Sequence, residues 1–111
     1  MENYIEQAKL FKALGDPKRA MIADMLSCGE LCACRILEKF SMSQSTLSHH
    51  MKLLCESGLV KARDAGKWTY YSLDGEAVER TKRFLDAMTS GKENCICKED
   101  SASCGEGGDC E

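Results

Sequence analysis

The stretch SQSTLSHHMKLLCESGLV, residues 43–60, has the pattern of a capped amphipathic helix that runs into a strand. Leu47, Met51 and Leu54 recur at the spacing of one helical face, which predicts a buried stripe. Ser43 stands directly before this pattern and is of the residue type that commonly caps a helix N-terminus. The sequence therefore predicts a helix that begins after Ser43 and turns one face toward a core.

The opposite face of this predicted helix carries short polar side chains and a cation. Its members are Gln44, Ser45, Thr46, Ser48, His49 and Lys52. The major groove of DNA admits a helix, and its base edges and phosphates suit such groups. A polar face on one helix is usually only a solvated surface, but its neighbours in the sequence favour double-stranded DNA as the partner. His50 lies near the apolar stripe, so we expect it to pack or form a hydrogen bond rather than contact bases.

Downstream, residues 59–73 change to a β pattern. LVKAR, a DAGK turn and KWTYYSL, rich in β-branched and aromatic residues, predict a β-hairpin. Arg63 and Lys67 would reach neighbouring DNA phosphates from this hairpin. We expect its aromatic residues, Trp68 among them, to pack the hairpin rather than contact bases.

Upstream, three further helices are predicted, and one more follows the hairpin. Their ranges are 3–14, from Pro17 to about Cys28, 31–40, and 75–89. Asp16 and Pro17 are typical of the start of the second helix. The order of three helices, a polar-faced helix, a hairpin and a last helix predicts a winged helix-turn-helix, a mainly α fold with a β-hairpin in the α+β class.

Cys32 and Cys34 fall two residues apart within the predicted helix 31–40. Helical residues turn by about 100 degrees each, so these thiols would lie about 200 degrees apart and could not close on one small ion without bending or unwinding the helix. Thiolates are soft ligands that select arsenic, antimony, lead, cadmium or zinc over magnesium or calcium. Either cysteine alone would more simply be a small buried residue. The pair favours a ligand site whose occupation reshapes the helix.

The length and composition indicate the compartment in which these thiols are found. The length of 111 residues suits one domain. The first residues do not have the pattern of a signal peptide, and the sequence contains no apolar run long enough to span a membrane. We therefore expect a cytoplasmic protein without a membrane partner. Eight cysteines in a reducing compartment are better explained as ligands, redox sensors or buried residues than as disulfides.

The acidic balance of the chain belongs to its last residues. The net charge is −3, but residues 91–111 hold two lysines and six acidic residues, which leaves 13 basic and 12 acidic residues in 1–90. This Gly- and Ser-containing segment cannot form a core, so we expect a DNA-binding and dimerisation domain over 1–90 and a flexible Cys-rich tail over 91–111. Cys95, Cys97 and Cys104 in the tail form an alternative thiolate site.

The segments ELCAC, SQSTLSHHMKLLCESGLV and GKWTYYSL closely resemble the ArsR/SmtB family of metal- and metalloid-responsive repressors, and especially its arsenite-sensing branch. The resemblance covers residues 8–88. It implies a homodimer whose first and last helices pair between subunits. It also implies a repressor that binds operator DNA without inducer and releases it when the inducer binds.

The resemblance also bears on the ligand set. The arsenite-sensing branch commonly has a third cysteine three residues after the second, where this chain has Leu37. The third ligand is therefore open between Cys55, on the edge of the recognition helix, and Cys28, one turn before Cys32. Zinc-sensing members use His and carboxylates on the last helix, and 75–89 contains no His. A tetrahedral Zn(II) or Cd(II) site would need four ligands, which C-x-C pairs from different segments or subunits could supply, whereas a three-thiolate site better suits As(III) or Sb(III). As(III) is therefore the first expected inducer, with Cd(II) or Pb(II) next.

Two other classes of function remain open from the sequence. A redox-responsive repressor would form a disulfide under oxidant and release DNA without metalloid. A metal-buffering protein would explain the tail but not the polar-faced helix. An enzyme is not expected, because the sequence has no C-x-x-C beside a βαβ pattern, no Gly-rich phosphate loop and no acid-base pair with the thiols.

Overall fold

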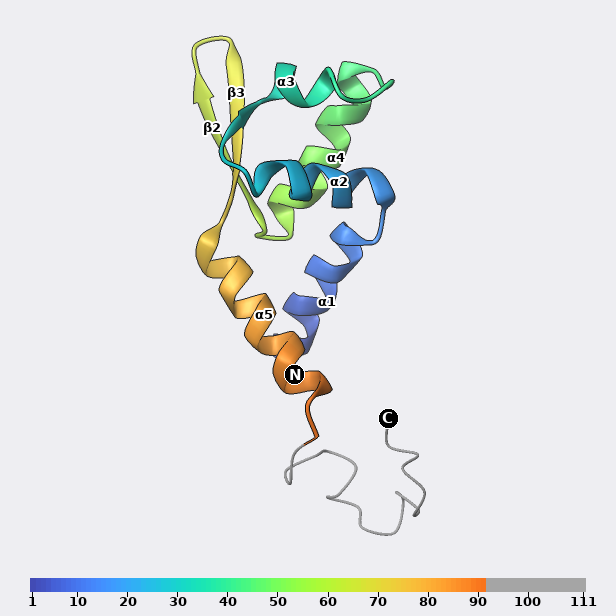
Figure 1. Cartoon of the computed structure of the whole chain (residues 1–111), viewed down its shortest axis with the longest axis vertical. Coiled ribbons are helices and arrows are strands. Elements are labelled where there is room, and N and C mark those ends of the chain that lie inside the picture. Colours follow the sequence, from blue (N-terminus) through green and yellow to red (C-terminus); the bar gives the residue numbers. More distant parts are fainter. Residues whose placement is uncertain (92–111) are drawn as a thin grey trace. The chain divides into compact units, whose positions relative to one another are not determined.

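The computed structural model describes residues 1–91. The elements are α1 (Glu2–Leu14), α2 (Pro17–Leu26), β1 (Leu31–Cys32), α3 (Ala33–Leu37), α4 (Gln44–Glu56), β2 (Val60–Ala65), β3 (Trp68–Leu73) and α5 (Gly75–Thr89). The chain divides into a compact unit, Met1–Thr81, and a second unit that begins at Lys82. Figure 1 shows α2, α3 and α4 gathered beside the β2–β3 hairpin in the first unit, which is the predicted winged helix-turn-helix. None of the helices within residues 1–91 has the length and hydropathy needed to cross a bilayer.

The helix starts follow from the residues expected to cap them. Asp16 accepts hydrogen bonds from the backbone N–H groups of Lys18 and Arg19, and Pro17 occupies the first turn of α2. Ser43 accepts from the N–H of Thr46 at the start of α4. Each cap satisfies donors that a helix N-terminus otherwise leaves without partners. The predicted starts of α2 and α4 are confirmed.

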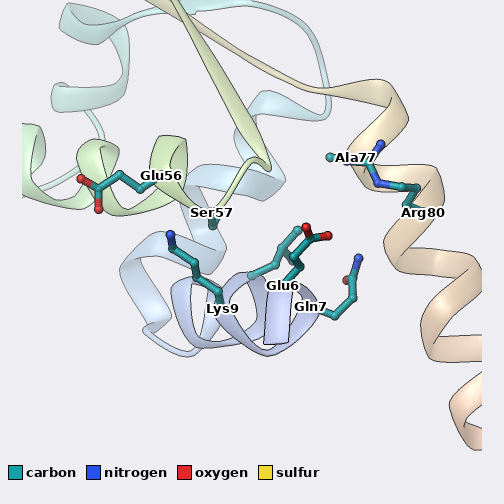
Figure 2. Close-up of a pocket in the computed structure, with 8 residues that line it drawn as sticks. Glu6, Gln7, Lys9, Glu56, Ser57, Ala77 and Arg80 are labelled. Carbon is teal, nitrogen blue, oxygen red and sulfur yellow. The ribbon is translucent and has the colours of Figure 1, made fainter. Parts of the chain in front are cut away.

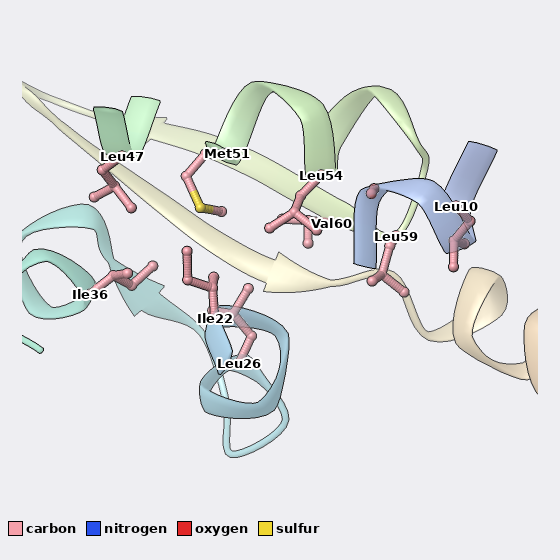
Figure 3. Packing of buried hydrophobic residues seen from close by; sticks show 10 residues of the cluster. Leu10, Ile22, Leu26, Ile36, Leu47, Met51, Leu54, Leu59 and Val60 are labelled. Carbon is pink, nitrogen blue, oxygen red and sulfur yellow. The ribbon is translucent and has the colours of Figure 1, made fainter. Parts of the chain in front are cut away.

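One apolar cluster holds α2, α3 and α4 together (Figure 3). Ile22, Ile36, Met51 and Leu54 are its most completely buried large side chains. Burial of such a side chain contributes about 1.5–3 kcal/mol relative to exposure. The stripe predicted for α4 therefore faces this core, which leaves the opposite side of α4 at the surface.

The prediction of one helix over 31–40 is wrong. Leu31 and Cys32 form strand β1, which pairs antiparallel with β3 through Leu31 opposite Tyr71 and Cys32 opposite Tyr70. The sheet order is β1-β3-β2, and helix α3 is only Ala33–Leu37. The physical reason is that the edge of β3 away from β2 is available for pairing, and residues 31 and 32 pair with it as an antiparallel strand. This pairing pulls the start of the segment out of the helix.

The helix predicted over residues 3–14 is confirmed as α1. Its buried residues are Gln7, Leu10 and Ala13. Tyr4 and Ile5 remain 46% and 62% exposed. Helix α1 therefore carries apolar side chains that this chain's own core does not cover.

Candidate functional site: a cysteine pair and the polar face of α4

The two cysteines of ELCAC lie together at the junction of β1 and α3. Cys32 is the N-cap of α3 with extended backbone angles, φ −69° and ψ 147°, and its Sγ accepts from the N–H of Cys34 at 3.3 Å. The Sγ atoms of Cys32 and Cys34 are 2.7 Å apart. The expected separation of about 200 degrees does not apply, because Cys32 lies outside the helix. The prediction that both thiols can meet one ion only if a helix unwinds is therefore wrong.

The hydrogen bond between the two sulfurs makes them chemically unequal. It lowers the pKa of Cys32 and raises the pKa of Cys34. The N–H groups at the start of α3 also lower the pKa of Cys32. Cys32 therefore loses its proton first, and a thiolate is the form of cysteine that binds soft ions and attacks electrophiles.

The structure does not bring a third ligand to this pair within residues 1–91. No group of three or more Cys, His, Asp or Glu side chains in that range has the spacing of a metal site. Cys55 is half-buried on α4, where burial raises the pKa of its thiol, and Cys28 is exposed after α2. The alternative site of Cys95, Cys97 and Cys104 lies outside the described residues.

The polar face of α4 lies at the surface as predicted. All of its predicted DNA-contacting side chains are exposed: Gln44, Ser45, Thr46, Ser48, His49 and Lys52. His50 is 9% exposed, and its Nδ1 lies 3.2 Å from Nη1 of Arg19. Nε of the same arginine donates to the carbonyl of Ala13. His50 is thus an interior hydrogen-bonding residue, as the sequence indicated.

The hairpin differs in detail from its prediction. Lys67 is exposed at the turn, where Gly66 has a φ of +69° that favours glycine. Tyr70 and Tyr71 are half-buried, whereas Trp68 is 44% exposed, so the expected packing of the hairpin aromatics is incomplete at Trp68. Trp68 lies opposite Ala65, at the end of the β2–β3 ladder next to the turn.

Arg63, predicted to reach phosphates, is paired within the chain. Its Nε and Nη2 donate to Oε2 and Oε1 of Glu30 at 3.0 and 2.8 Å, and its guanidinium lies 4.9 Å from the centre of the Tyr70 ring. The hydrogen bonds from Arg63 lower the pKa of Glu30. Sequence reasoning did not anticipate that Glu30 and Tyr70 contact Arg63. The one signal was that Glu30 precedes Cys32 by two residues, the same-side spacing of an extended segment.

A hollow of about 280 Å³ lies between α1, the end of α4 and the first turns of α5. Figure 2 shows Glu6, Lys9, Glu56 and Arg80 around it. Its lining mixes acids and bases and includes no cysteine. It therefore does not fit a soft ion, and the cysteine pair remains the candidate ligand site within residues 1–91.

The chain is similar to known bacterial regulatory proteins. Residues 16–62 match the model of a family described as "Bacterial regulatory protein, arsR family". The chain is 45% identical over 96 residues to the arsenical resistance operon repressor of Staphylococcus xylosus, covering 86% of this chain and 92% of that protein. It is 46% identical over 87 residues to a cadmium resistance transcriptional regulatory protein CadC homolog of Staphylococcus aureus, covering 76% and 72%.

Among solved structures, the chain is similar to the NMR structure of a homodimeric winged helix-turn-helix DNA-binding domain from Mycobacterium bovis. That protein is described as a possible ArsR-family transcriptional regulator. This match has a TM-score of 0.65 and 31% identity, and it covers 78% of this chain and 81% of that chain. The chain is also similar to the crystal structure of the transcriptional regulator HlyU from Vibrio vulnificus. That match has a TM-score of 0.60 and 31% identity, and it covers 80% of this chain and 93% of that chain.

Proposed function

Because the chain belongs to the arsR family of bacterial regulatory proteins, we propose that it is a cytoplasmic homodimeric repressor of a metalloid-resistance operon. Its α4 and β2–β3 hairpin bind operator DNA, and As(III) or Sb(III) bound by Cys32 and Cys34 causes release. The observation that carries this proposal is the 2.7 Å separation of the two sulfurs, directly before the helix-turn-helix.

The DNA side of the proposal rests on the exposed surface of α4. Its N-terminal turn presents Gln44, Ser45 and Thr46, which can hydrogen-bond base edges. His49 and Lys52 continue the same surface, and Lys52 supplies a charge for phosphate. The hairpin adds Lys67 at its exposed turn. These groups divide into base-reading and backbone-positioning contacts, as in other helix-turn-helix proteins.

The ligand side rests on the donor set. Two adjacent thiols with no carboxylate between them suit a soft, thiophilic ion, and Cys32 supplies the first thiolate. Three-thiolate binding of As(III) needs one more cysteine, for which Cys28, Cys55 and the tail cysteines are the candidates. The arsenical resistance and cadmium resistance relatives support As(III) or Sb(III) first and Cd(II), Pb(II) or Zn(II) as alternatives.

Release requires that the ligand bind one protein conformation better than another. Because the thiols already lie together, that difference does not have to come from unwinding a helix. Cys32 belongs to β1, whose partner β3 is a strand of the hairpin, and α3 leads directly into the turn before α4. A shift of Cys32 therefore acts on both DNA-contacting elements.

Dimerisation is supported by apolar surface that the chain leaves uncovered. Tyr4 and Ile5 on α1 are exposed, as are Leu85 and Met88 on α5. Apolar side chains gathered into one exposed patch mark an interaction surface, and we propose that these four belong to such a patch in the dimer. The Mycobacterium bovis relative is homodimeric, which supports the same assembly here.

The sulfur separation also favours a second candidate, a thiol-redox repressor. Oxidation of the two thiols by hydrogen peroxide would form one S–S bond and release two protons and two electrons, which reduce the peroxide to water. Cys32 would attack first as the thiolate, and Cys34 would resolve the sulfenic acid. This candidate predicts DNA release by peroxide that a dithiol reductant reverses.

The test uses a fluorescein-labelled duplex selected by the protein from a random-sequence pool, with binding followed by anisotropy. Arsenite, Cd(II), Zn(II) and peroxide are titrated into the complex of the wild type and of Cys32→Ser, Cys34→Ser, Cys28→Ser and Cys55→Ser. A protein truncated after Ser90 tests the tail. We expect arsenite to release the wild type but neither Cys32→Ser nor Cys34→Ser.

Cys28→Ser and Cys55→Ser serve as matched controls, because each also replaces one sulfur by oxygen, but at a position outside the cysteine pair. If Cys55→Ser or Cys28→Ser also stops responding, that residue is the third ligand. If the truncated protein no longer responds while Cys32→Ser does, the tail holds the sensor instead. A fully reduced wild type that keeps its affinity for the duplex at saturating arsenite refutes the proposal.

A further inference from the structure

We propose that the Glu30–Arg63 ion pair couples the cysteine pair to the DNA-binding hairpin. In this inference, Arg63 exchanges Glu30 for a DNA phosphate when the repressor binds its operator, and ligand capture by Cys32 and Cys34 holds Arg63 on Glu30. Glu30 is thus a positioning residue, and the inference rests on the function proposed above.

The four groups involved share one side of the three-stranded sheet. Tyr70 of β3 lies opposite Cys32 of β1 and opposite Arg63 of β2. Residues directly opposite in antiparallel strands direct their side chains to the same face. The Arg63 guanidinium lies over the Tyr70 ring, and Glu30, two residues before Cys32, closes the group with two hydrogen bonds to Arg63.

The same edge of the guanidinium can bind either a carboxylate or a phosphate. Arg63 uses Nε and Nη2 on the two oxygens of Glu30, which is the geometry that arginine also uses with phosphate. The side chains of Arg63 and Glu30 are 57% and 38% exposed. Exposed ion pairs add little net stability, so a phosphate with its neighbouring charges can replace Glu30.

The cysteine ligand acts on this exchange through the backbone. Cys32 holds the ligand through Sγ and is paired to Tyr70 in the sheet, so fixing its sulfur fixes β1 against β3. Glu30 is joined to β1 at Leu31 and is held in place with it. Its carboxylate then stays hydrogen-bonded to Arg63, whose guanidinium lies over Tyr70, and keeps Arg63 from the DNA.

The experiment measures how duplex affinity depends on salt, with and without arsenite, between 50 and 200 mM. In a dimer the retention of two Arg63 side chains removes two phosphate contacts, so we expect the arsenite-loaded wild type to have a slope of log K against log salt shallower by about 1.8. In Glu30→Gln this difference should vanish and release by arsenite should weaken. Protection of Cys32 and Cys34 from alkylation, read by mass spectrometry, checks that this variant still binds arsenite.

Glu38→Gln is the matched control. Glu38 makes an exposed ion pair with Arg35 at 3.7 Å and also lies close to the cysteines in sequence, so the variant removes the same charge without touching Arg63. It should behave as the wild type does. In an Arg63→Gln background, Glu30→Gln should have no further effect, because the two residues act as one unit.

Two results would overturn the inference. One is an arsenite-dependent slope change in Glu30→Gln equal to that of the wild type; the other is its loss in Glu38→Gln as well. If arsenite does not release the wild type, the proposed function fails on its own. The exchange is then judged without inducer, where Glu30→Gln should bind the duplex more tightly than Glu38→Gln, and equal affinities refute it.

Discussion

Removal of the two exposed lysines that face DNA in the proposed complex should change the salt dependence of binding by a calculable amount. Lys52 lies on the polar surface of α4 and Lys67 at the turn of the hairpin, and both are exposed. Neither belongs to an ion pair found within residues 1–91. Their charges are therefore available to phosphates, and replacement of both by Gln removes two phosphate contacts from each protomer.

The magnitude follows from counterion release. Four contacts are lost per dimer, so the slope of log K against log salt should become shallower by about 3.6. Between 50 and 200 mM salt, the ratio of wild-type to variant affinity should then fall about 150-fold. A loss of this kind is strongest at low salt and is largely independent of the DNA sequence.

The assay is anisotropy of the labelled duplex at a series of salt concentrations, with Lys12→Gln as the control. Lys12 is exposed on α1 and carries the same charge, but it lies outside the polar face and the hairpin. Its slope should match the wild type. An unchanged slope in Lys52→Gln/Lys67→Gln would refute the assignment of these residues to phosphates, and with it the docking of α4 and the hairpin on DNA.

Three further outcomes are expected. Leu54→Ala, at a fully buried position, should lower the free energy of unfolding in urea by about 2–5 kcal/mol. Leu53→Ala, at a half-buried position, is the control and should lower it by less. If Leu54→Ala lowers it by less than Leu53→Ala does, the core described here is contradicted. Ser43→Ala should lower the free energy of unfolding by about 1 kcal/mol, measured in the same way, because the α4 N-cap is lost. Ser43→Asn should keep most of the wild-type stability, because Asn also caps helices. Burial lowers the pKa of His50 below its ordinary value of 6.5, so the unfolded chain binds more protons in acid and stability should fall as pH drops through 6.5. His50→Asn should flatten this part of the stability profile while His49→Gln, at an exposed position, should not, and an unchanged slope in His50→Asn would show that another group is responsible.

Local chemistry determined most of the helix-turn-helix. The caps Asp16 and Ser43, the apolar stripe of α4 and the hairpin turn each depend on residues a few positions apart, so their sequence patterns were sufficient. The exposure of the α4 polar surface followed from the same spacing. So did the interior position of His50, although not its partner, Arg19.

Contacts between distant segments decided the rest. Strand β1 forms because Leu31 and Cys32 pair with residues of β3 about forty positions later. The hydrophobic periodicity within 31–40 could not predict this pairing, because it depends on the distant β3 edge. The cysteine pair was recognised from its residue types, but its geometry depends on this pairing, since it moves Cys32 out of the helix. The Glu30–Arg63 contact arises from the same sheet. The sequence by itself therefore determined which polar, basic and thiol side chains the chain offers, whereas the tertiary structure decided which of them meet. The physical reason is that a strand pairs with whichever strand edge the assembled sheet places beside it, and local spacing in the sequence does not specify that edge.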